Sequence, residues 1–298
     1  MNRRTLLKAI PVSLATAVGL RLRGSSEQAY GVFRYWLDRR LRSVPHSDRL
    51  DPVRDEGAMS AASRLDKIRD FDRTYDDDHL LDESGFQVLR STAARVERTQ
   101  RLVGHGNFNL LSFDQLLSFA SNYPEIGEFT AAELAFLDEI FHTDARRYGF
   151  FGEKVVEEQT AVIDRRTVIK IPGSGHFLLK GEPLKKFMKI KRDVGSTVVL
   201  TSGVRSVAKQ YQLFLTKAVE TGGNLSQASR SLAPPGYSFH ARGDFDLGKA
   251  GFGLGNFDES FCETDEYRRL IDLGYVAIRY TETNPFGVRH EPWHIKIA

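Results

Sequence analysis

The chain has 298 residues, of which 41% are hydrophobic and 27% charged, a composition typical of a globular protein and not of a disordered one. Five of its 42 Lys and Arg residues lie within residues 1–23, which contain no Asp or Glu, so the rest of the chain is slightly acidic. This balance argues against a nucleic-acid binder. A single cysteine, Cys262, excludes an internal disulfide and a Cys-rich zinc module, whereas a zinc site built from His and carboxylate side chains stays open.

Residues 1–28 resemble an export signal. The pair Arg3-Arg4 precedes an apolar run from Ala9 to Leu20, which is shorter than the roughly 20 residues of a membrane span. The adjacent arginines favour the twin-arginine type, with an ordinary secretory signal as the alternative. No clear cleavage site follows the run, so an uncleaved anchor stays open. We expect export to the periplasm or cell envelope of a bacterium, with membrane contact only through an uncleaved leader.

Residues 29–155 are predicted to form a mostly helical region without assignable chemistry. Helices are expected over residues 29–41, 84–103 and 110–121, with a loop over 43–58. The sequence Thr130-Ala131-Ala132-Glu133 is a capping box, which predicts a helix continuing to Phe141. The acidic run 76–78, followed by His79 and Asp82, is interpreted as a solvated loop and not as a metal site.

Residues 156–298 are predicted to form a second domain, of the α+β class. Strands are expected over residues 167–171, 197–201, 275–280 and 294–297, and helices over 183–194, 208–219 and 264–273. The segment 221–237 is predicted to be a loop, because it contains Gly222-Gly223 and Pro234-Pro235-Gly236.

Three clusters in this second domain could carry chemistry. They are Ser202–Ser206, Ser238–Asp246 and His290–His294. The last reads H-E-x-x-H, the motif that places two zinc-binding histidines one turn apart on a helix. Pro292 disfavours a helix there, so we reject that geometry. The residue types still suit a zinc site formed around a turn and a last strand.

A catalytic zinc ion needs three protein ligands and an open position for water. His240, Asp246 and His294 supply two imidazoles and one carboxylate. A carboxylate that is not a ligand must then move the proton of the water, and Glu291 is the natural candidate. Arg205, which is charged at any working pH, would stabilise the negative tetrahedral intermediate. Taken singly, each histidine could equally be structural and Arg205 a surface ion-pair partner.

These residues occur in a familiar pattern. Ser202–Ser206 with Gln210, Pro235–Gly243 and Glu291–His294 resemble the zinc D-Ala-D-Ala carboxypeptidases of the VanY type, within the lysostaphin/D-Ala-D-Ala peptidase/hedgehog fold group. The resemblance covers roughly residues 170–298. It implies a small antiparallel sheet flanked by helices, a bound Zn²⁺ ion, and the stem peptides of peptidoglycan as substrate.

The resemblance also assigns roles to individual residues. It implies zinc ligation by His240, by an aspartate just downstream and by His294. It implies that Glu291 is the general acid/base and that Arg205 polarises the scissile carbonyl. The residues that would hold the substrate are Ser238, Gln210 and Tyr237.

One departure concerns the aspartate ligand. The family has it seven residues after the first histidine, where this chain has Leu247, whereas Asp246 comes six residues after His240. We choose Asp246 and keep Asp244 as the alternative. If neither reached the metal, the domain would be a non-catalytic wall binder; an endopeptidase cutting cross-links or an L,D-bond is a further alternative. His176 lies in a flexible-looking loop without an assigned partner.

Overall fold

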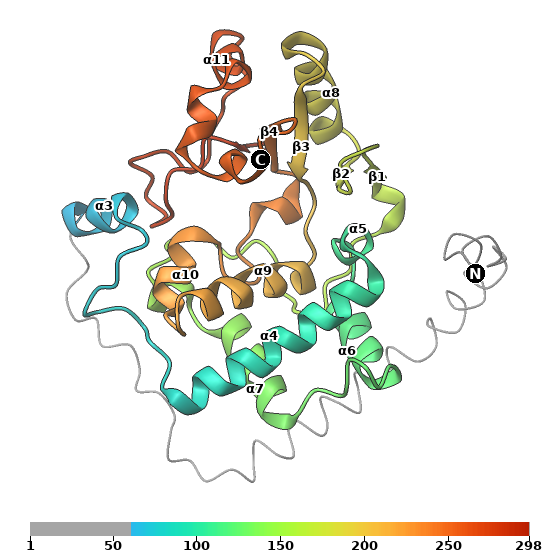
Figure 1. Cartoon of the computed structure of the whole chain (residues 1–298), viewed down its shortest axis with the longest axis vertical. Coiled ribbons are helices and arrows are strands. Elements are labelled where there is room, and N and C mark those ends of the chain that lie inside the picture. The colour runs from blue at the N-terminus through green and yellow to red at the C-terminus, as the bar shows by residue number, and fades with distance from the viewer. Residues whose placement is uncertain (1–60, 298) are drawn as a thin grey trace, which may run out of the picture. The chain divides into compact units, whose positions relative to one another are not determined.

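The computed structural model describes residues 61–297 (Figure 1). The export signal, the helix expected over 29–41 and the loop over 43–58 lie outside these residues. The described chain is α+β, as expected, with small antiparallel sheets and a largely helical N-terminal part. Within residues 61–297, no helix combines the length and the apolar character that crossing a membrane requires.

A three-stranded antiparallel sheet carries the residues of interest. Its order is β3-β4-β5, formed by β3 (Val198–Ser202), β4 (Phe245–Lys249) and β5 (His294–Ile295). Residues in β3 alternate between more and less buried positions, because successive side chains point to opposite faces of the sheet. A separate hairpin pairs β1 (Val168–Lys170) with β2 (Phe177–Leu179).

The strand predicted over residues 275–280 is wrong. The segment makes only an isolated bridge between Ile278 and Ile295. The backbone N–H of Ala277 donates to the carbonyl of Tyr275, two residues earlier, so a tight local turn interrupts the extended conformation. The last strand is likewise shorter than predicted, since only His294 and Ile295 pair as strand β5.

Helices α8 (Glu182–Val194) and α11 (Asp265–Asp272) accompany the sheet in the upper part of Figure 1. Helix α8 begins with Pro183 near its N-terminus, where a missing N–H costs nothing. Phe187 of α8 packs edge-to-face on Phe245 of β4, at 6.0 Å between ring centroids. The shared apolar core also contains Leu200, Leu247, Phe261, Leu270, Trp293 and Ile295.

The remaining helices form the lower part of Figure 1. They are α3 (Ala61–Arg69), α4 (Glu83–Val103), α5 (His105–Phe108), α6 (Phe113–Asn122), α7 (Ala131–His142), α9 (Val207–Glu220) and α10 (Leu225–Ser231). Short 3₁₀ turns are η1 (Ala145–Tyr148), η2 (Arg165–Thr167), η3 (Phe239–Arg242), η4 (Gly253–Phe257) and η5 (Glu259–Glu263). The predicted capping box is present at Thr130 and Glu133, and the helix it predicts is α7.

Helix α10 corrects the prediction of an uninterrupted loop over 221–237. The side chain of Asn224 accepts a hydrogen bond from the backbone N–H of Gln227, which satisfies a free donor in the first turn. The glycines at 222 and 223, both with positive φ, end α9 immediately before this cap. Gly222 and Gly223 therefore do mark a turn, as predicted, but this turn separates helices α9 and α10.

Helix α9 joins the helical part to the sheet. The hydroxyl of Tyr211 donates to the carbonyl of Leu137 and accepts from the amide of Gln159. The Tyr211 ring also packs on Phe113, at 5.8 Å between centroids. Residues on both sides of position 155 thus share one core, and the domain boundary placed there stays a prediction.

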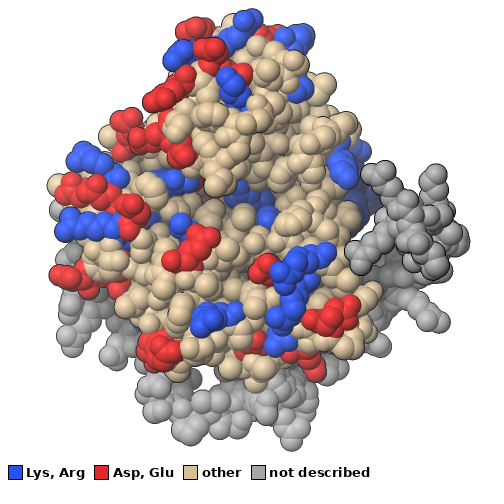
Figure 2. Space-filling view, viewed as in Figure 1, with Lys and Arg blue, Asp and Glu red and all other residues tan. Residues whose placement is uncertain are grey.

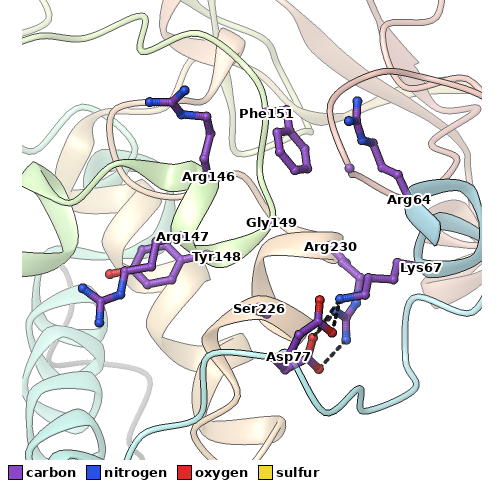
Figure 3. Close-up of a pocket in the computed structure, with 12 residues that line it drawn as sticks. Arg64, Lys67, Asp77, Arg146, Arg147, Tyr148, Gly149, Phe151, Ser226 and Arg230 are labelled. Atoms are coloured by element: carbon purple, nitrogen blue, oxygen red, sulfur yellow. Dashed lines mark hydrogen bonds and ion pairs between the residues drawn. The ribbon is translucent and has the colours of Figure 1, made fainter. Parts of the chain in front are cut away.

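The acidic segment Asp76–Asp78 is not the fully solvated loop that the sequence predicts. Asp78 is 2% exposed at its side chain and lies 2.7 Å from the guanidinium of Arg230, which is also buried. Burial alone would raise the pKa of Asp78, but hydrogen bonds from Arg230 and Asn224 hold it below its usual value. Figure 3 shows Arg230 and Lys67 turned toward this segment, in a cavity of about 120 Å³, whereas Arg147 points away.

Replacing Asp78 with asparagine is expected to destabilise the fold by about 3–5 kcal/mol, because it leaves the buried Arg230 without its counter-charge. Thermal and urea unfolding at neutral pH would measure this loss. Asp77 is the control: it pairs with Lys67 but is 63% exposed, so Asp77→Asn should cost no more than about 1 kcal/mol. Because the pKa of Asp78 is depressed in the folded state, its contribution should fade as the pH falls below the ordinary carboxyl range. Equal losses for the two variants would contradict the importance of burial.

Candidate active site

The sheet brings two of the three candidate ligands together. In the antiparallel pairing of β4 with β5, Asp246 is the direct partner of His294. Side chains of directly opposed residues lie on the same face of a sheet. The carboxylate oxygen Oδ1 of Asp246 lies 3.2 Å from Nδ1 of His294. The register of the antiparallel pair therefore brings Asp246 and His294 together, although they are 48 positions apart in the sequence.

The third candidate, His240, is delivered by the 3₁₀ turn η3, which ends at Gly243. Gly243 has φ of 112°, and a Cβ there would lie 2.7 Å from Pro183, so only glycine fits this tight turn into β4. Nε2 of His240 then lies 3.4 Å from Oδ1 of Asp246. Ligand atoms of His240, Asp246 and His294 all lie within 4.8 Å of one another, and all three side chains are buried.

Hydrogen bonds fix which imidazole nitrogens face the centre of this cluster. Nδ1 of His240 lies 2.8 Å from the carbonyl oxygen of Gly203, which can only accept, so Nδ1 carries the proton and Nε2 faces Asp246. Nε2 of His294 lies 3.0 Å from Oδ2 of Asp244, which leaves Nδ1 toward the centre. Burial lowers the pKa of His240 to about 4, so this ring is neutral and able to bind a metal.

The two aspartates have different surroundings. Asp244 is fully engaged: it accepts hydrogen bonds from Nε of Arg279, the ring of His294 and the backbone N–H of Ile297. In contrast, Oδ1 of Asp246 is buried and, among residues 61–297, has no hydrogen bond of good geometry, although it faces two imidazoles. A buried carboxylate oxygen in that position needs a cation. The donor set of two nitrogens and one oxygen fits zinc, and Asp244 occupies the supporting position of a carboxylate behind a histidine ligand.

Arg205 reaches the same cluster from the turn after β3. Its Nη2 donates to Oδ2 of Asp246 at 2.7 Å, and its Nε donates to the hydroxyl of Ser202 at 2.9 Å. The adjacent Gly203 is required by close packing, since a Cβ there would lie 2.0 Å from the carbonyl oxygen of Phe177. Nη1 of Arg205 makes no hydrogen bond among residues 61–297.

Glu291 lies beside the cluster on a turn and not on a helix. The backbone N–H of His294 donates to the carbonyl of Glu291 across Pro292, and the N–H of Glu291 donates to Tyr280. This turn brings Oε2 of Glu291 within 3.6 Å of Nδ1 of His294. Burial raises the pKa of Glu291 to about 7, which suits a group that takes up and releases a proton near neutrality.

The three residues expected to hold substrate have other contacts. The amide of Gln210 donates to the carbonyl of Ala233, while its Oε1 is buried without a partner. The hydroxyl of Tyr237 accepts from the backbone N–H of Ala145, at 3.4 Å. Ser238 is buried immediately before η3. Their roles toward a substrate stay predictions.

Sequence reasoning missed several supporting residues. It did not predict that Ser202 contacts Arg205 or that Gly203 contacts His240, and it assigned no partner to His176. Nδ1 of His176 lies 3.3 Å from the side-chain amide of Asn109, in the segment after α5. Burial lowers the pKa of His176 to about 4, with smaller contributions from nearby Arg205 and Lys209. No local pattern joins positions 109, 176 and 205, because three separate elements bring them together.

A buried cluster of two histidines and one aspartate, on a small antiparallel sheet with a carboxylate beside it, is the arrangement of a metallopeptidase-type domain. Residues 181–297 match the model of the VanY family, described as D-alanyl-D-alanine carboxypeptidase. These residues therefore form a VanY-type domain, of a family of peptidases that act on peptidoglycan, and the resemblance expected from the sequence is confirmed. No curated protein matches the chain.

Several solved structures are similar to part of the chain. The LD-carboxypeptidase LdcB is 21% identical, with a TM-score of 0.35 over 43% of this chain and 62% of that chain. The D,D-pentapeptidase VanY, solved as a mutant in complex with Zn(II), is 23% identical. Its TM-score is 0.32, and the overlap covers 43% of this chain and 76% of that chain. The D,D-dipeptidase VanXYg, in complex with a D-Ala-D-Ala phosphinate analogue, is 24% identical. Its TM-score is 0.34, and the overlap covers 45% of this chain and 53% of that chain. This chain spans less than two thirds of the length of LdcB. The family match, not these partial overlaps, identifies the domain.

Figure 2 shows that the face in view is hollowed between its upper and lower parts, with Lys and Arg side chains inside the hollow. A cavity of about 340 Å³ lies between α3 and the segments around residues 258 and 282–290. Its lining includes His290 but none of the candidate ligands, nor Glu291 or Arg205.

Proposed function

We propose that the protein is a zinc-dependent D-alanyl-D-alanine carboxypeptidase that shortens peptidoglycan stem peptides in the bacterial cell envelope. The observation that carries this proposal is Oδ1 of Asp246, which is buried between His240 and His294 and finds no hydrogen-bond donor of good geometry in the described part of the chain. Residues 181–297, which match the D-alanyl-D-alanine carboxypeptidase family model, contain all three side chains and Glu291.

His240, Asp246 and His294 would hold the zinc ion. When bound by such a set, zinc lowers the pKa of water from about 15.7 to near 7 and polarises a carbonyl. Asp244 keeps His294 in the required tautomer, because its carboxylate accepts the Nε2 proton. The carbonyl of Gly203 does the same for His240 through Nδ1.

Glu291 would act as the general base and then the general acid. Its carboxylate takes a proton from the attacking water and delivers it to the nitrogen of the departing D-alanine. Burial suits this role, since the raised pKa matches the uptake of that proton. Arg205 places a fixed positive charge beside the centre, and its free Nη1 is available to the oxyanion that develops on the scissile carbonyl.

The purified full chain is expected to contain about one zinc ion per molecule and to release D-alanine from stem peptides that end in D-Ala-D-Ala. Elemental analysis and mass spectrometry of digested muropeptides would measure both. Removal of zinc with a chelator should stop the release, and added zinc should restore it. A protein that binds no zinc and leaves all muropeptides intact would contradict the proposal and support a wall-binding role.

An endopeptidase is the second candidate, because the same residues around a zinc ion would also serve a bond inside a peptide chain. The same digest separates the two activities, because an endopeptidase would cut cross-linked dimers, whereas a carboxypeptidase would remove only a terminal residue.

A further inference from the structure

Lys209 is a cation beside the candidate active site that has no anionic partner. Helix α9 starts directly after Arg205, with Ser206 as its N-cap, so Lys209 lies in the first turn. Its Nζ donates to the neutral Oε1 of Gln212 at 2.6 Å. Within the described part of the chain, no carboxylate forms an ion pair with it.

The position of Lys209 makes this lack of a partner unfavourable. Its side chain is half-buried, and its ammonium lies within electrostatic range of the Arg205 guanidinium, which precedes the N-cap of the helix. Burial and, secondly, the Arg205 guanidinium lower the pKa of Lys209 to about 8. Asp246 is the one carboxylate paired with Arg205 within residues 61–297, and no carboxylate there pairs with Lys209. A bound anion would relieve this imbalance.

The hairpin β1–β2 and the end of α5 enclose the same place. The backbone N–H of Ser206 donates to the carbonyl of Asn109, and the N–H of Val204 donates to Phe177 in β2. His176, between β1 and β2, hydrogen-bonds with Asn109 and lies within electrostatic range of both Arg205 and Lys209. Asp246 also lies within electrostatic range of His176, but its carboxylate is already paired with Arg205.

We infer that Lys209 binds the terminal carboxylate of the peptide substrate, next to the carbonyl that Arg205 polarises. This inference rests on the proposed function and names Lys209 as the residue that recognises the C-terminus of the substrate peptide. In a peptide that loses its last residue, the free carboxylate lies only one residue beyond the scissile bond, within reach of a lysine neighbouring Arg205. A peptide cross-linked through a lysine-type side-chain amine has no carboxylate there, so Lys209 would favour removal of a terminal residue over cutting such a cross-link.

The test compares diacetyl-L-Lys-D-Ala-D-Ala with its C-terminal amide on the zinc-loaded full chain. Lys209→Met should raise KM for the free acid at least tenfold with little change in kcat, because a charge-assisted contact to the substrate is lost. Turnover of the amide should stay within twofold, and Lys209→Arg should restore part of the preference for the acid. Lys217→Met is the matched control: Lys217 lies on the same helix, pairs with Glu220 and should behave as wild type.

Calorimetric binding of the same two peptides to the zinc-loaded Glu291→Gln variant supplies a readout without turnover. Stronger binding of the acid, lost when Lys209→Met is added, supports the inference even if the wild-type protein hydrolyses neither peptide, in which case only the proposed function fails. Conversely, Lys209→Met effects of equal size on acid and amide would overturn the inference while the peptidase assignment stands. Equal binding of the two peptides, or binding of neither, would also overturn it.

Discussion

Replacing Glu291 with glutamine is expected to lower kcat by about 10²–10⁴-fold while leaving zinc bound. The amide keeps the shape of the side chain but cannot take the proton of the attacking water, and general acid–base catalysis contributes a factor of this size. Glu291 is buried, and its carboxylate lies 3.6 Å from Nδ1 of His294. Release of D-alanine and the zinc content of the same sample would be measured together.

Glu263→Gln serves as the matched control, since Glu263 is an exposed glutamate of the same domain that lies away from the cluster. It should retain both zinc and activity. Near-normal turnover of Glu291→Gln would remove Glu291 from the acid/base role. Loss of zinc in that variant would instead indicate that Glu291 is a ligand.

Replacing Asp246 with alanine is expected to lower zinc affinity by more than about 100-fold, because the change removes a ligand and also the partner of Arg205. Asp244→Asn should weaken zinc by only about 10–100-fold, the usual effect of losing a carboxylate that supports a ligating histidine. Competition with a fluorescent chelator would give both affinities, with circular dichroism confirming that each variant folds.

The order of these two effects tests the choice between the aspartates. The sequence left Asp244 open because the spacing from His240 to Asp246 is one residue shorter than in the family pattern. Among residues 61–297, three donors occupy Asp244 and none occupies Oδ1 of Asp246, which favours Asp246 as the ligand. A larger loss of zinc in Asp244→Asn than in Asp246→Ala would reverse the assignment.

The sequence predicted those parts of the fold that local signals encode. The capping box at Thr130 located α7, and the β-branched run at 197–201 located β3 within one residue. It failed where a tight turn interrupts a segment of strand-like composition. In residues 275–280, Ala277 donates a hydrogen bond back to Tyr275, and only Ile278 still bridges to Ile295 of β5.

The candidate site was predictable to a similar extent. The clusters around His240, Asp246, Glu291 and His294 stand out because zinc chemistry needs those residue types, and the structure gathers them in one place. The supporting residues were not predictable in this way. Gly203 acts through its carbonyl oxygen, which every residue has, and Lys209 is one lysine among many until the fold shows its lack of a counter-charge.

The packing of α9 has a consequence for how the protein can be divided. The family match begins at residue 181, yet Tyr211 and Phe214 of α9 rest on Leu137, Phe113 and Tyr148, all of which precede it. A fragment limited to the matched residues would present this aromatic surface to water and would lose Asn109, whose carbonyl anchors Ser206. The upstream helices thus cover an aromatic face of α9, and a fragment limited to residues 181–297 is expected to aggregate.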